Sequence, residues 1–201
     1  VECEIIDYVN EYRSNAYNMF EHAKKELKNK RIIPAAKYFI GSMFMYNRKR
    51  KFLNFYERNL ICTDVQYTTS EEAEHLNSSY DKFVVGSDQV WNYKNNGNDY
   101  AFLLDFVKDD EKKISYSSSF GLADIPTELR QKYVENLTRI THLSTREEYG
   151  VKLIKDLVGR KAELVLDPVF LLSKSQWLSL CSNTSKIERY VFSYTNRAGQ
   201  W

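Results

Sequence analysis

The chain has 201 residues, of which 43% are hydrophobic and 28% charged, with only 7 Gly and 3 Pro. That composition excludes collagen-like and largely disordered chains, and no apolar run reaches the roughly 18 residues that a membrane-spanning helix requires. The net charge of +2 excludes a uniformly basic nucleic-acid binder. The three cysteines are odd in number and widely spaced, so they predict neither a disulfide framework nor a metal site.

Charge is unevenly distributed along the chain. Residues 21–60 contain 11 Lys and Arg against 3 Glu, whereas residues 61–111 contain 3 Lys against 11 Asp and Glu. The basic run consists of Arg48, Lys49, Arg50 and Lys51. It is either a solvated helix face or a patch for an anionic partner, such as anionic lipid, nucleic acid or a phosphorylated substrate.

The first 60 residues predict one strand and two helices. Residues 3–8 have the pattern of a buried strand, and apolar residues recur at helical spacing across residues 11–30. Pro34 opens a second helix that continues toward Leu60. These helices are interpreted as an excursion over about residues 11–60 that follows the first strand.

From residue 70 onward, short apolar runs alternate with helical patterns. Strands are predicted at residues 83–85, 114–116, 140–144 and 163–166, and helices at residues 70–76, 126–137 and 149–157. Gly159 suits the left-handed C-cap of the last helix, and residues 92–100 form a loop. Such alternation predicts an α/β fold with a mostly parallel sheet flanked by helices.

Polar residues follow each of these four strands. They occupy positions 86–89, 117–121, 144–147 and 167–168. In an open parallel sheet the carboxyl ends of the strands share one crevice, where ligands bind. The four segments are therefore predicted to face a common site.

Asp88 is the best-placed candidate for a catalytic group. A carboxylate at a strand end can accept a hydrogen bond from a sugar hydroxyl or act as a general base. Gly86 would let the backbone approach a ligand closely, and Ser87 and Gln89 are candidate substrate contacts in the same segment. The structural alternative is that Asp88 caps the next helix or turn.

Other side chains near these junctions have two interpretations each. Trp91 could stack on a sugar ring, or it could be a buried core residue. The hydroxyls and amides of Ser117, Ser118 and Ser119, beside Gly121, suit an anion or a sugar, or the small residues could simply permit tight packing.

Arg146 and Glu147 follow the third predicted strand. They could bind substrate as a pair, or they could form a salt bridge that holds a loop. The sequence contains no GxGxxG, GxxxxGK[ST], HExxH or GxSxG motif, so no nucleotide, zinc or serine-hydrolase signature competes with this interpretation.

The amino-acid sequences of several segments are similar to those of a known family. Residues 80–92 read YDKFVVGSDQVWN, residues 101–107 AFLLDFV, residues 112–121 KKISYSSSFG, residues 144–150 STREEYG and residues 164–177 LVLDPVFLLSKSQW. In order and spacing these segments closely resemble the polysaccharide pyruvyl transferase family.

The resemblance implies a fold. Family members resemble two-domain, GT-B-like glycosyltransferases built from paired Rossmann-like halves. Residues 1–173 are then expected to form the N-terminal Rossmann-like domain, residues 174–188 a linker, and residues 189–201 the start of a second domain. The chain is expected to be truncated at both ends, and this piece alone is expected to be inactive.

The resemblance also implies a reaction. Such enzymes transfer a pyruvyl group from phosphoenolpyruvate to sugar hydroxyls as a ketal, and the mechanism demands no metal or cofactor. Asp88 would then be a base or a hydroxyl-orienting group, and Arg146 would be one anion contact. The N-terminal half would mainly bind the acceptor. The implied partners are phosphoenolpyruvate and a sugar or lipid-linked glycan, with no nucleic acid.

The expected setting is cell-envelope polysaccharide biosynthesis in the cytoplasm, peripheral to the inner face of the membrane. Two other functions stay open from the sequence. One is a GT-B-type glycosyltransferase that uses a nucleotide-sugar donor. The other is a non-catalytic glycan-binding module.

Overall fold

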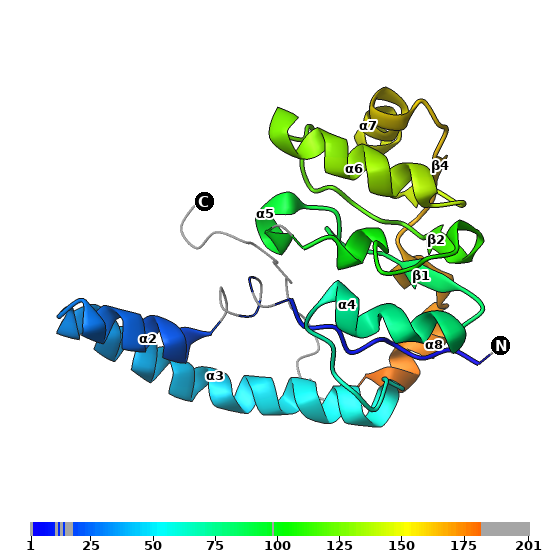
Figure 1. Cartoon of the computed structure of the whole chain (residues 1–201). Coiled ribbons are helices and arrows are strands. Elements are labelled where there is room, and N and C mark those ends of the chain that lie inside the picture. Colours follow the sequence, from blue (N-terminus) through cyan, green and yellow to red (C-terminus); the bar gives the residue numbers. More distant parts are fainter. Residues whose placement is uncertain (1, 11, 13, 15–17, 98, 182–201) are drawn as a thin grey trace, which may run out of the picture. The chain divides into compact units, whose positions relative to one another are not determined.

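The computed structural model describes residues 2–10, 12, 14, 18–97 and 99–181 (Figure 1). The chain divides into two compact units, Val1–Asp167 and Pro168–Trp201. The first unit is a mixed α/β structure in which helices predominate over short parallel strands.

Two helices follow the N-terminal segment and pack side by side. Helix α2 spans Met19–Lys28, and α3 spans Ile32–Asn59 (Figure 1). The side chain of Asn18 caps α2 by accepting from the backbone N–H groups of Phe20 and Glu21. The two predicted helices are confirmed, although residues 11, 13 and 15–17 of the first lie outside the described residues.

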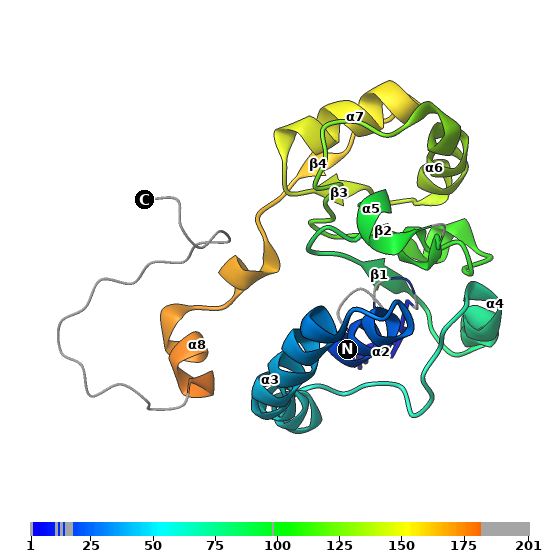
Figure 2. The ribbon, with the colours of Figure 1, turned by 90° about the vertical axis from the view of Figure 1, so that its left-hand side faces the viewer.

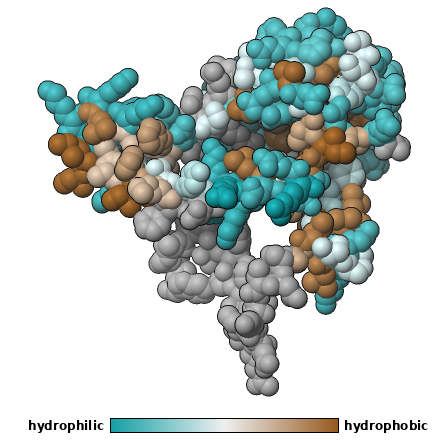
Figure 3. Space-filling model, turned by 90° about the horizontal axis from the view of Figure 1, so that it is seen from below, coloured by the Kyte–Doolittle hydropathy of each residue, from teal (hydrophilic) through white to brown (hydrophobic). Residues whose placement is uncertain are grey.

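Helix α3 exposes apolar side chains along its length. Ile32, Ile33, Met43 and Tyr46 are each more than 60% exposed. Figure 3 shows hydrophobic side chains beside hydrophilic ones over the pair of helices α2 and α3, at the left of the view. Even so, none of the described helices is both long enough and apolar enough to span a bilayer.

The N-terminal segment is not the buried strand that the sequence predicts. It makes only two isolated parallel bridges, from Ile5 to Cys62 and from Tyr8 to Tyr67. Among the described residues, backbone pairing of this segment is with residues 61–67 alone, and Ile5 is 46% exposed. The apolar pattern was therefore correct in marking an extended segment but wrong about its burial.

Parallel pairing, by contrast, is confirmed. Strand β1 (Phe83–Val85) pairs with β2 (Lys113–Ser115), and β3 (Ser144–Thr145) pairs with β4 (Glu163–Leu164). Isolated parallel bridges, Ile114–His142 and Ser118–Thr145, link the two small sheets. The sheet is narrower than predicted, and β1 is not fully buried, because its central residue Val84 is 64% exposed.

The helices of this region lie close to their predicted positions. They are α4 (Ser70–Ala73), η1 (Glu74–Ser78), α5 (Tyr93–Asn96), η2 (Ala101–Leu103), η3 (Asp110–Lys112), α6 (Thr127–Arg139) and α7 (Glu148–Val158). Gly159 caps α7 in the left-handed conformation, as predicted, and its N–H donates to Lys155 O. The short helix α5 lies within the predicted loop 92–100. Helix α7 packs against α6, β3 and β4 (Figure 2).

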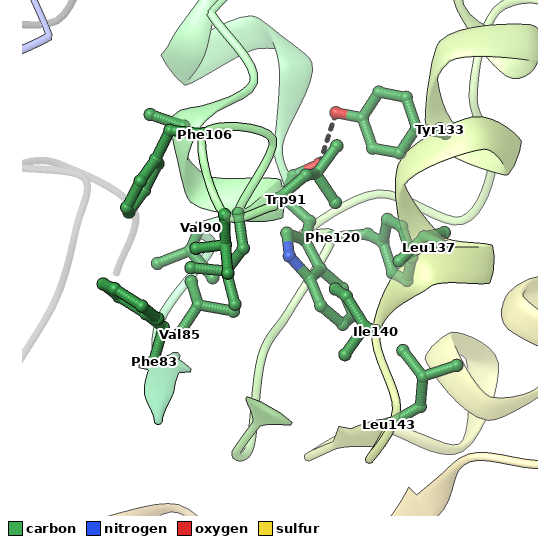
Figure 4. Close-up of a cluster of buried hydrophobic side chains, with 14 of the residues drawn as sticks. Phe83, Val85, Val90, Trp91, Phe106, Phe120, Tyr133, Leu137, Ile140 and Leu143 are labelled. Carbon is green, nitrogen blue, oxygen red and sulfur yellow. Dashed lines mark hydrogen bonds between the residues drawn. The ribbon is translucent and has the colours of Figure 1, made fainter. Parts of the chain in front are cut away.

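An aromatic and aliphatic core lies between the strands and α6 (Figure 4). The Trp91 and Phe120 ring centroids are 5.0 Å apart, and the Tyr133 hydroxyl donates to Trp91 O at 2.8 Å. Leu137 and Ile140 are completely buried beside them. This core holds the loop after β1, on which the candidate site depends.

The second unit contains η4 (Pro168–Leu171) and α8 (Lys174–Leu180). A capping box between Ser173 and Gln176 begins α8, and Trp177 Nε1 donates to Val169 O at 2.8 Å. Helix α8 thus occupies the first part of the range expected to be a linker. The expected start of a second domain, residues 189–201, lies outside the described residues.

Candidate active site

The segments that follow the strands come together, as the parallel arrangement predicts. Ser118, after β2, bridges to Thr145 at the end of β3. Ser87, after β1, donates to Asp167 Oδ2 at 3.2 Å, although Ser87 and Asp167 are 80 residues apart in sequence. The carboxyl ends of the strands therefore share one polar cluster.

Arg146 is the centre of this cluster. Its guanidinium lies 2.7 Å from Asp167 Oδ2, 3.1 Å from Glu147 Oε1 and 3.6 Å from Asp88 Oδ1. Burial alone would lower the pKa of Arg146, but the hydrogen bonds that Arg146 donates to Asp167 and Glu147 outweigh the effect of burial and raise that pKa above its usual value. One cation and three carboxylates leave the cluster with two excess negative charges.

The salt-bridge interpretation of Arg146 and Glu147 is therefore the one that the structure displays. Sequence reasoning named the junction at position 167 but missed Asp167 as the main partner of Arg146. The only available signal was its position directly after the fourth predicted strand.

Asp88 presents its carboxylate at the open side of the cluster. The side chain is 68% exposed, whereas Arg146, Glu147 and Asp167 are each less than 30% exposed. Its carbonyl oxygen accepts from Ser119 N at 3.0 Å, which ties this loop to the segment after β2. The following helix, α5, is capped by Asn92 rather than by Asp88. Asp88 is thus the cluster's most accessible carboxylate.

The two predicted loop glycines allow close packing within the protein, and their contact with a ligand stays a prediction. Gly86, whose peptide bond to Ser87 is cis, has φ of 130°, and a Cβ there would lie 1.9 Å from Tyr116 O. A Cβ on Gly121 would lie 2.4 Å from Gln89 Cδ. Gln89, half-buried over Gly121, accepts from Asn92 Nδ2 at 2.9 Å and so belongs to the loop's own packing.

The three serines are completely buried. Ser118 Oγ donates to Val85 O at 3.1 Å, Ser119 Oγ accepts from Gly121 N at 3.0 Å, and Ser117 N donates to Ser144 Oγ at 3.0 Å. In this conformation Ser117, Ser118 and Ser119 stabilise the loop and present no hydroxyl to a ligand. This conformation fits the tight-packing alternative, and the role of these serines as substrate contacts stays a prediction.

Trp91 likewise fits its structural alternative. Its ring is 1% exposed, and Nε1 donates to Phe102 O at 3.0 Å. A ring in this position has no free face on which a sugar could stack, so the alternative of a core tryptophan holds (Figure 4).

A second polar feature was not predicted from the sequence. A cavity of about 550 Å³ is lined by Tyr8, Asn10, Tyr12, residues 68–71, residues 96–97, Asp99, Tyr100 and Asp105. Its walls come from segments far apart in sequence, such as those of Tyr8 and Asp99, which are 91 residues apart, and they carry no common motif, so no local pattern marks the cavity. Among the described residues, no group of three or more His, Cys, Asp or Glu side chains is arranged to hold a metal ion.

With this geometry in place, comparison with known proteins identifies the class. A family model, that of the polysaccharide pyruvyl transferases, matches residues 1–199. The chain belongs to the polysaccharide pyruvyl transferase family, and membership makes it an enzyme that transfers a pyruvyl group to a polysaccharide. Comparison with curated proteins and with solved structures gave no match.

Proposed function

We propose that this chain holds the sugar acceptor of a phosphoenolpyruvate-dependent pyruvyl transferase and that Asp88 acts on the acceptor hydroxyl. The observation that carries the proposal is the exposed carboxylate of Asp88 at the meeting point of the strand ends, 3.6 Å from Arg146. Family membership supplies the reaction, and this cluster supplies a base for it.

The overall reaction converts two hydroxyls of one sugar and the enol phosphate into a cyclic ketal and inorganic phosphate. The methylene carbon of phosphoenolpyruvate gains a proton and becomes a methyl group, and both sugar oxygens bond to the neighbouring carbon, from which phosphate leaves. One hydroxyl proton is taken up by Asp88 during the attack and then released to solvent, which balances the proton that a general acid adds to the methylene carbon. The second hydroxyl proton leaves with the departure of phosphate.

The charge of the cluster favours the acceptor over the donor. Phosphoenolpyruvate carries a phosphate and a carboxylate, which require cationic or amide donors. Arg146 is the one cation among the described members of the cluster, and its contacts with Asp88, Glu147 and Asp167 already offset its charge. We propose that Arg146 positions Asp88 and that the donor-binding cations come from another part of the enzyme.

The same proposal extends to the fold. All pairing between the described strands is parallel, and two isolated bridges connect the small sheets. These features support one Rossmann-like sheet within residues 1–173 of a GT-B-like enzyme, with ligands at its carboxyl edge.

We also propose that α3 rests on the inner, cytoplasmic face of a membrane during catalysis. Arg48, Lys49, Arg50 and Lys51 are exposed beside exposed apolar side chains of the same helix. Replacing these four residues with Gln should abolish cosedimentation with vesicles that contain phosphatidylglycerol. Undiminished cosedimentation would reject this contact without affecting the proposed reaction.

Product analysis tests the reaction. The full-length protein is incubated with phosphoenolpyruvate and a glycan acceptor, and the acceptor is examined by mass spectrometry for a pyruvyl ketal while phosphate release is followed. Nucleotide release from a nucleotide-sugar donor would favour the glycosyltransferase alternative. Acceptor binding without consumption of any donor would favour the binding module.

A further inference from the structure

We infer that the cavity lined by Tyr8, Asn10, Tyr12, residues 68–71, residues 96–97, residues 99–100 and Asp105 binds a neutral sugar unit of the acceptor glycan, a different unit from the one that reacts at Asp88. This inference rests on the proposed function, because it names an additional subsite for the same acceptor. It identifies the ligand class by four properties of the cavity: size, hydrogen bonding, charge and an exposed aromatic ring.

The cavity is large enough for a monosaccharide. Its volume is about 550 Å³, within the range of roughly 300 to 1,000 Å³ typical of small-molecule sites. The lining residues with roles in the argument are Tyr12, Ser70, Asn96, Asp99, Tyr100 and Asp105.

The carboxylates of the cavity wall are held in place by their own hydrogen bonds. Asp99 Oδ2 accepts from Tyr8 OH at 2.7 Å and from Asn10 Nδ2 at 2.6 Å, and Asp99 Oδ1 accepts from Ala101 N at 2.9 Å. Asp105 Oδ1 accepts from the Ser70 hydroxyl at 2.5 Å. Fixed carboxylates of this kind can accept hydrogen bonds from sugar hydroxyls without first reorganising.

Asn96 supplies an acceptor that the protein leaves unpaired. Its side chain is 96% buried, and its Nδ2 donates to Val90 O at 2.6 Å. Its Oδ1 has no hydrogen-bond partner among the described residues. Leaving a buried acceptor unpaired is costly. Because this oxygen is itself inaccessible to solvent, a ligand hydroxyl would donate to it only after the Asn96 side chain turned toward the cavity that this residue lines.

The charge of the cavity selects against anions. Its described lining includes Glu71, Asp99 and Asp105 but neither Lys nor Arg. Burial raises the pKa of Asp105, and the neighbouring Asp99 and Glu71 raise it further, so additional negative charge is disfavoured here. A neutral polyhydroxyl ligand fits this wall, whereas phosphoenolpyruvate does not.

An exposed aromatic ring completes the site. Tyr12 is 58% exposed and lies over Gly97, where a Cβ would come within 3.1 Å of the Tyr12 Cγ. Aromatic rings offer an apolar face to the C–H side of a pyranose while their hydroxyl stays in water. Unlike Trp91, Tyr12 has an accessible ring.

The loop after β1 connects this cavity with the proposed base. Asp88 and Asn96 belong to the same loop, which is held internally by contacts from Asn92 Nδ2 to Gln89 Oε1 and from Asn96 Nδ2 to Val90 O. A glycan bound along this loop would place one unit in the cavity and another toward Asp88.

Saturation-transfer NMR tests the subsite with methyl β-glucopyranoside, methyl β-galactopyranoside and methyl α-mannopyranoside as probes. We expect saturation transfer to at least one glycoside in the full-length protein. Tyr12→Ala should weaken its binding by about tenfold, the loss expected for one aromatic contact, whereas Tyr12→Phe should retain it. Tyr46→Ala, which removes a comparably exposed tyrosine from α3, is the matched control and should bind normally.

Failure of the subsite and failure of the proposed function are distinguishable. No saturation transfer to any of the three glycosides, or equal binding by Tyr12→Ala and Tyr46→Ala, would overturn the subsite even if phosphoenolpyruvate is consumed. Binding that depends on Tyr12 in a protein that never consumes phosphoenolpyruvate would support the subsite and reject the proposed function.

Discussion

Replacing Gly86 with Ala should be one of the most damaging single-methyl changes in the chain. Gly86 has φ of 130°, a conformation that costs a non-glycine residue about 1 to 3 kcal/mol. The new Cβ would also lie 1.9 Å from Tyr116 O, a backbone atom that can move only if β1 and β2 separate. Separation would weaken two hydrogen bonds to Val85 O, from Tyr116 N and Ser118 Oγ, at about 1 kcal/mol each.

We therefore expect Gly86→Ala to lower the free energy of unfolding by about 4 kcal/mol, measured by urea denaturation. Gly159→Ala is the matched control, because Gly159 also has a positive φ, 69°, but a Cβ there would meet nothing within 4 Å. It should cost only about 1 to 2 kcal/mol, the backbone penalty alone. Equal losses in the two variants would refute the close approach of β1 and β2 on which the position of Asp88 depends.

Three further changes test the core and two charged groups, one buried and one half-buried. Leu137→Ala should lower the free energy of unfolding by about 2 to 5 kcal/mol in urea denaturation, because Leu137 is completely buried, and a loss below about 1 kcal/mol would contradict its place in the core. Burial lowers the pKa of Lys113, whose Nζ is fully buried 3.4 Å from Asp110, so the wild type gains stability as pH rises toward the ordinary lysine range. Lys113→Met should therefore be more stable than wild type by about 1 kcal/mol near pH 7, with a difference that shrinks at alkaline pH, and a growing difference would be inconsistent with this burial. Burial raises the pKa of Asp105, so the wild type loses stability as pH rises from the ordinary carboxyl range. The urea midpoint of Asp105→Asn should match that of the wild type in acid and exceed it at neutral pH. The opposite trend would argue against a carboxyl whose charged form is disfavoured by burial.

Short-range patterns predicted the elements well where one segment determines its own structure. The apolar run that ends at Gly86 marked β1, and Gly159 marked the end of α7, because the apolar pattern of a strand and the left-handed cap of a helix are both read from neighbouring residues. The N-terminal segment was misjudged because its burial depends on which segments pair with it, and Ile5 bonds to a segment more than 50 residues later.

In the candidate site, too, some features were predictable from the sequence and others depend on tertiary contacts. The expected parallel sheet predicted that residues 87–88, 146–147 and 167 would lie close together, because the topology alone places their backbones at the carboxyl edge of the sheet. Side-chain direction was not predictable: no local pattern shows that Ser117, whose φ is 57°, is completely buried with the two serines after it, or that Arg146 reaches Asp167. The cavity depends on contacts such as Tyr8 with Asp99, which only the tertiary fold creates.

The kinetics of Asp88→Asn in the full-length protein, measured as pyruvyl ketal formed on a glycan acceptor, test the central claim most directly. Asp81→Asn, which changes another exposed aspartate just before β1, is the control. A base that acts on the acceptor predicts that Asp88→Asn lowers kcat by about 100-fold or more while KM for phosphoenolpyruvate stays near the wild-type value, with Asp81→Asn unaffected. Wild-type kcat in Asp88→Asn, or a loss confined to KM for phosphoenolpyruvate, would contradict the assignment.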